Sequence, residues 1–83
     1  MENFDYSEYS IEVLENAIAN AEQAIKDRKE YARRYAKNLT LHNGRGFSSE
    51  TKRMFKSYIK YAPALIACRE KEIAECKAEI ASR

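Results

Sequence analysis

Two runs of apolar residues at alternating spacings of three and four constrain what this chain can fold into. The first run is Ile11, Leu14, Ile18, Ala21, Ile25, Arg28, Ala32, Tyr35 and Leu39, with one arginine among the apolar residues. The second is Phe55, Ile59, Ala62, Ile66, Arg69, Ile73, Cys76 and Ile80, again with one arginine. This spacing places side chains along one stripe of an α-helix, here called the seam. We therefore expect two long helices, over residues 10–39 and 48–82.

The segment between them, TLHNGRGF at 40–47, contains both glycines of the chain and is typical of a turn. Ser10 precedes the first seam, and Ser48 or Ser49 precedes the second, as helix N-caps do. A short arm over 1–9 holds Asp5 and Glu8 at the spacing of a capping box, which favours a helical turn there. The predicted fold is all-α: an antiparallel two-helix hairpin with an N-terminal arm.

Three residues disturb this regular design. Pro63 removes the hydrogen bond to the Ile59 carbonyl, so we expect the second helix to bend or break near 59–62. Arg28 and Arg69 interrupt the seams. We expect their guanidinium groups to extend from the seam edge to nearby carboxylates, those of Glu15 and Glu22 for Arg69. The alternative is a polar cavity shared within an oligomer.

Each helix also carries a second apolar stripe that one hairpin cannot bury. The stripes are Ala17, Ala24 and Tyr31 on the first helix, and Met54, Tyr58, Tyr61, Leu65 and Cys68 on the second. A chain of 83 residues gains little stability from its own core. The stripes therefore predict a helical homo-oligomer.

Charge is distributed very unevenly along the chain. Residues 1–25 hold six acidic residues and no lysine or arginine, and 61–83 are balanced. Residues 26–60 hold eleven lysines and arginines against three acidic residues, in a chain with a net charge of +2. Such an excess favours an anionic partner at the hairpin tip.

The turn and the following helix start form the first candidate site. Glycines let a backbone approach a ligand, and a helix start presents unpaired N–H groups, which together suit a phosphate. The residues predicted to bind there are Arg45, Ser48, Ser49, Lys52, Arg53 and Lys56. The alternative is a plain helix–helix connector, since glycine and asparagine are ordinary turn residues.

The second candidate site is Tyr31-Ala-Arg-Arg-Tyr35. Tyr31 and Tyr35 are four residues apart, so their rings share a helix face, where Arg33 and Arg34 are close by. Such a face can stack a base and hold its phosphate. The alternative is that Tyr35 belongs to the core and the arginines are solvated.

The sequence indicates no catalytic set, no cofactor and no metal site. His42 is the only histidine and lies in the turn, and Cys68 and Cys76 match no ligand spacing. The cysteines are about 12 Å apart along a helix, too far for a bridge between them. With no apolar run long enough to span a bilayer and no signal segment, we expect a cytoplasmic protein.

These observations favour a non-enzymatic protein that captures a phosphate-bearing nucleotide at its tip. A nucleic-acid-binding module and a protein-binding inhibitor or scaffold remain alternatives. The hairpin layout, with a kinked arm and the tip sequences RRYAK and NGRGFSS, resembles small phage-encoded counter-defence proteins of the nucleotide-sponge or anti-CRISPR type. That resemblance implies sequestration or inhibition and assigns no site residues.

Overall fold

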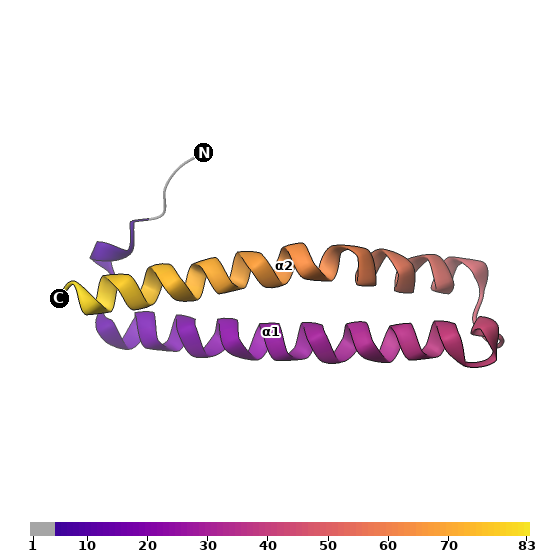
Figure 1. The fold of residues 1–83 in the computed structure, drawn as a ribbon. Helices are drawn as coiled ribbons and strands as arrows, with labels where there is room; N and C mark the ends of the chain where they lie inside the picture. The colour runs from indigo at the N-terminus through magenta and orange to yellow at the C-terminus, as the bar shows by residue number, and fades with distance from the viewer. Residues whose placement is uncertain (1–4) are drawn as a thin grey trace.

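The computed structural model describes residues 5–83, apart from the side chains of His42 and Asn43. Two long helices lie side by side and antiparallel, with the start of the first helix and the C-terminus at one end of the hairpin and the turn at the other (Figure 1). The all-α hairpin predicted from the seams is therefore confirmed. In chain order the elements are η1 (Tyr6–Glu8), α1 (Ile11–Thr40), η2 (Leu41–Gly44) and α2 (Ser49–Ala81).

Serine caps begin both long helices. The Ser10 hydroxyl oxygen accepts a hydrogen bond from the Val13 N–H at 3.2 Å, and Ser48 does the same for Thr51 at 3.1 Å. Each bond satisfies one of the N–H groups that a helix start leaves without a partner. In the arm, the Asp5 carboxylate accepts from the Ser7 N–H at 3.0 Å, so η1 forms where a helical turn was expected.

Stacked rings fix the register between the two helices. The centroids of Tyr35 and Phe55 are 4.5 Å apart, with ring planes 17° from parallel. Heptads counted from this pair place Leu14 level with Cys76, and those two side chains are 1% and 0% exposed. The same count places Arg28 level with Ala62 and Arg69 level with Ala21. The interior thus alternates large residues with small ones along the seam.

The core is only one layer thick. The buried apolar side chains among the described residues are Leu14, Ala21, Phe55, Ala62 and Cys76. Apart from Ile11, which is exposed, the isoleucines of the seams are half-buried, because α1 and α2 cover only one side of each other. The hairpin measures 54 × 24 × 14 Å, so it is little thicker than a single helix with its side chains.

The seam arginines extend to one side of the hairpin and find partners other than the predicted ones. Arg69 pairs with Glu72, one turn away on its own helix, at 3.0 Å, and not with Glu15 or Glu22. The Arg28 guanidinium lies over the Tyr58 ring, 4.9 Å from its centroid. Glu15 and Glu22 flank the seam of α1 on the opposite lateral side, whereas Arg69 and Glu72 line the same side of the hairpin.

Helix α2 continues through Pro63 without a break. Proline provides no N–H, so the Ile59 carbonyl lacks its helical donor there. Pro63 is exposed and follows the seam residue Ala62, so it lies on the same lateral side of α2 as Lys56. The break that the sequence allowed does not occur, and the bend stays a prediction.

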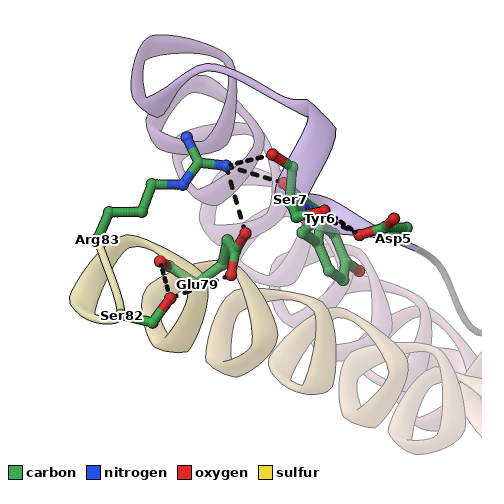
Figure 2. A network of polar contacts seen from close by, with 6 residues as sticks. All are labelled: Asp5, Tyr6, Ser7, Glu79, Ser82 and Arg83. Carbon is green, nitrogen blue, oxygen red and sulfur yellow. Dashed lines mark hydrogen bonds and ion pairs between the residues drawn. The ribbon is translucent and has the colours of Figure 1, made fainter.

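A polar cluster fastens the arm to the end of α2 (Figure 2). The Arg83 guanidinium donates to the backbone carbonyls of Tyr6 and Ser7 at 3.1 and 3.2 Å, and lies 3.4 Å from the Glu79 carboxylate. The Tyr6 hydroxyl donates to Glu75. Burial, followed by the hydrogen bond to Glu75 and its charge, raises the pKa of Tyr6 to about 12. Buried surroundings also raise the pKa of the Cys76 thiol.

Replacing Pro63 with alanine restores one helical hydrogen bond and removes the steric conflict with the preceding turn. We expect Pro63→Ala to raise the free energy of unfolding by about 1–3 kcal/mol. Urea denaturation followed by circular dichroism measures this change. An unchanged or lower midpoint would show that Pro63 fits α2 without cost.

The raised pKa of Tyr6 makes the docking of the arm depend on pH. The folded state favours the protonated phenol, so its contribution is complete below pH 10 and is lost as the pH rises from 10 to about 12. We expect wild type to lose more stability than Tyr6→Phe over that interval, measured by urea denaturation at several pH values. Tyr9→Phe is the matched control, because it removes the same hydroxyl from an exposed tyrosine just after η1. Parallel losses in wild type and Tyr6→Phe would contradict the assignment.

Candidate functional site

An aromatic cluster holds the two helices together at the tip. Tyr35 stacks on Phe55, and its ring also meets Tyr58 edge to face at 5.1 Å. Phe47, just before α2, meets Phe55 edge to face at 5.1 Å. Aromatic pairs at these distances stabilise by about 0.5–1.5 kcal/mol beyond the area they bury. Tyr35 therefore serves in the core, and its ring faces are largely occupied.

The turn depends on backbone conformations that suit glycine. Gly44 and Gly46 have φ angles of 72° and 94°. A Cβ atom on Gly44 would lie 3.1 Å from the Cε atom of Lys52, so the lysine stem packs directly over this glycine. Lys52 is accordingly half-buried, while Arg45 is exposed. A hydrogen bond from the Phe47 N–H to the Gly44 carbonyl at 3.2 Å closes the turn.

The two predicted serines have different positions at the start of α2. The Ser48 hydroxyl is engaged in capping, since it contacts both the N–H and the hydroxyl of Thr51. Ser49 is the first residue of the helix and is exposed. Glu50 in the same turn carries a negative charge that competes with an anionic ligand there. The helix start is therefore less open to a phosphate than the sequence indicated.

Tyr31 and Arg34 form a contact on one side of the tip. The Arg34 guanidinium lies 5.5 Å from the centroid of the Tyr31 ring and forms an ion pair with Glu30 at 3.0 Å. Tyr31 is 43% exposed, and its ring lies 6.1 Å from that of Tyr35. Of the tip cations, Arg34 is the one with a carboxylate partner among the described residues.

The other side of the tip carries a face that is purely cationic. Because the seams face each other, residues flanking both seams on this side share one lateral surface, here called the basic face. Its members, all exposed, are Lys26, Lys29 and Arg33 on α1, and Arg53, Lys56 and Lys60 on α2. Helix register places no acidic residue among them. By the same register, Arg33 lies within one residue of level with Lys56, and Lys29 lies equally close to level with Lys60.

The opposite lateral surface is apolar and aromatic, and we call it the tyrosine face. It consists of Ala17, Ala24 and Tyr31 on α1, and Met54, Tyr58, Tyr61, Leu65 and Cys68 on α2. The predicted site residues are thus divided. Arg33, Arg53 and Lys56 lie on the basic face, and Tyr31 and Arg34 on or beside the tyrosine face. Arg45, Ser48, Ser49 and Lys52 lie at the turn.

The sequence-based prediction of the site did not include three cations of the basic face, Lys26, Lys29 and Lys60. Their spacing in the sequence indicates that they share one face with the predicted residues. Positions 26, 29 and 33 on α1, and 53, 56 and 60 on α2, follow the same 3-4 pattern as the seams, displaced by one position.

The described residues contain no group of three or more histidine, cysteine or acidic side chains that could hold a metal ion. Within the same residues, no helix is both long and apolar enough to cross a membrane. The exposed groups at the tip include the cations of the basic face and the ring of Phe47. Comparison with protein-family models, with curated proteins and with solved structures finds no match for this chain.

Replacing Gly44 with alanine tests how the turn positions the tip. The positive φ angle and the contact with Lys52 both oppose a Cβ atom, so we expect a loss of about 1–2 kcal/mol in unfolding free energy. Gly46→Ala is the matched control: its φ is also positive, but no atom lies within 4 Å of the added carbon. Gly44→Ala is expected to be at least as destabilising as Gly46→Ala by thermal and urea denaturation. A neutral Gly44→Ala would contradict this account of the turn.

Proposed function

We propose that this chain is a non-enzymatic binding protein that captures a phosphate-bearing nucleotide on the basic side of its hairpin tip, and that it works as a homo-oligomer. The observation that carries the proposal is the basic face. Its six exposed cations lie together without an acidic residue between them. None forms an ion pair within the part of the chain that is described. Clustered cations repel one another, and a bound polyanion offsets that repulsion.

The length of the basic face supports a small ligand. Arg53 and Lys60 are seven residues apart on α2, or about 10 Å along the helix. Beyond Lys26 and Lys60 the same lateral surface is mostly acidic, with Glu12, Glu15, Glu22 and Glu70 flanking the seams against one cation, Lys77. These carboxylates repel a polyanion that continues along the hairpin. The phosphates of one nucleotide fit this length better than a nucleic-acid strand does.

The tip also offers flat apolar surface for a base. Phe47 is 36% exposed at the turn, whereas Tyr31 lies on the tyrosine face, away from the basic face. Stacking on such rings is tolerant of base identity, and arginine contributes through its planar guanidinium. Phosphate held by the basic face and a base held by an exposed ring together define a nucleotide. In this role the chain would act as a nucleotide sponge, as the resemblance of its layout to counter-defence proteins implies.

A protein-binding inhibitor is the second candidate, and one observation favours it. The basic tip and the acidic half follow each other on one lateral surface, which suits a partner protein with the reverse arrangement. The affinity for such a partner would fall on charge reversal in either half of this surface. The affinity for a nucleotide would fall only on charge reversal at the tip.

Isothermal titration calorimetry with mono-, di-, tri- and cyclic nucleotides tests the proposal. We expect uptake of at least one nucleotide by wild type, and a loss of at least about tenfold in affinity for Arg33→Ala combined with Lys56→Ala. The matched control is Lys71→Ala with Lys77→Ala, which removes the same charge from the far half of α2 and leaves the basic face intact.

Two results would overturn the proposal. One is no uptake of any nucleotide, and the other is equal affinity in the tip variant and its control. Gel shifts with a single-stranded oligonucleotide separate the nucleic-acid alternative. Tight binding that weakens steeply as salt rises would favour that module over a nucleotide sponge.

A further inference from the structure

The tyrosine face is an exposed apolar surface on a hairpin with little core of its own. Met54 and Tyr61 are 56% and 55% exposed, and Tyr31 and Leu65 are 43% and 41% exposed. These side chains come from both helices and share one lateral surface, on which the exposed Cys68 also lies. A chain of this size buries such a surface to gain the stability that one layer of core lacks.

A groove in this face contains the two seam arginines. Its volume is about 220 Å³, and its apolar lining includes Ala24, Ile25, Leu65 and Ile66. Arg28, Arg69 and Glu72 also line the groove, so three charges lie within an otherwise apolar surface. Arg69 and Glu72 form an ion pair, whereas Arg28 contacts the Tyr58 ring and no carboxylate among the described residues.

We propose that a second copy of this chain covers the tyrosine face, in an antiparallel dimer whose twofold axis passes near Leu65 and Ala24. The proposal rests on the homo-oligomer in the proposed function and names the surface and the orientation. Each helix then meets its own copy running in the opposite direction. The product is a four-helix bundle in which each tip lies beside the acidic half of the other chain.

Side-chain size supports this axis. A twofold axis at Ala24 places Tyr31 opposite Ala17 of the second copy, and the same axis places Leu65 opposite its equivalent. On α2, Tyr61 comes opposite the small side chain of Cys68 of the second copy, within one residue. Large side chains thus meet small ones along both helix pairs, the arrangement that fills an interface without voids.

Charge supports the antiparallel orientation. Residues 26–60, which form the tip, have an excess of eight positive charges, whereas residues 5–25 hold five acidic residues and no basic one. A parallel dimer would bring the two basic tips together, at a cost that the antiparallel dimer avoids. The proposed axis also places Glu72 of the second copy opposite Tyr58, whose ring carries Arg28. That carboxylate supplies the partner that Arg28 lacks in one hairpin.

Sedimentation velocity without any ligand tests the surface. We expect wild type to sediment as a dimer at tens of micromolar and Leu65→Lys to sediment as a monomer. Residue 65 lies on the twofold axis, so the two introduced lysines would face and repel each other. Ala67→Lys is the matched control, since it adds the same charge at an exposed position on the opposite side of α2. It is expected to remain dimeric. A monomeric wild type, or a dimeric Leu65→Lys, would overturn the interface.

Disulfide trapping tests the orientation. A chain carrying Tyr61→Cys and Cys68→Ser is mixed with wild type under oxidised glutathione. The antiparallel dimer predicts a mixed disulfide between position 61 of one chain and Cys68 of the other, in excess over both homodimeric products. A parallel dimer about the same face places α2 opposite α1 of the second copy and yields no such excess, which would overturn the proposed axis.

These results are separable from those for nucleotide capture. A dimer that takes up no nucleotide would retain the interface and remove the proposed ligand. A monomer that still binds nucleotide through Arg33 and Lys56 would retain the ligand and remove the interface.

Discussion

The rest of the structure depends on the packing of large side chains against small ones across the seam, because this packing sets where the two seam arginines leave the core. Arg28 lies level with Ala62, and Arg69 level with Ala21, and both alanines are almost completely buried. An arginine in a two-helix seam does not keep its charged group in the core, so the guanidinium leaves at the edge. Both guanidinium groups leave on the side of the tyrosine face, where they line the same groove.

The seam therefore gives the hairpin two unlike lateral faces. One is aromatic and apolar and contains two arginines, and the other is basic near the tip and acidic farther away. A single layer of core buries neither lateral face. Both faces are therefore available in one hairpin to bind different partners. In our account the tyrosine face binds a second copy, and the basic face remains exposed in that dimer to bind an anion. Assembly and ligand binding thus use opposite sides of the same helices.

Much of the fold was predictable from spacing and caps. The seams predicted both helices and their antiparallel pairing, and Ser10 and Ser48 mark the helix starts. The partners of Arg28 and Arg69 were not predictable, because they depend on which edge of the seam each stem leaves from. Pro63 shows a similar limit, since packing along α2 holds the helix together through a residue that local rules expect to break it.

The candidate site was predicted only in part, for a physical reason. Nearness along the chain grouped Arg33, Arg34 and Tyr35, but successive helical residues point 100° apart and reach different surfaces. Tyr35 enters the core beside Phe55, and Arg34 pairs with Glu30. The basic face is assembled from both helices, so it becomes visible only once the register between them is known.

Native mass spectrometry of the protein as purified from cells reports assembly and bound ligand in one experiment. We expect two chains that carry additional mass equal to a nucleotide, released on activation as a phosphate-bearing ion. A single chain without added mass would contradict both the dimer and the captured ligand.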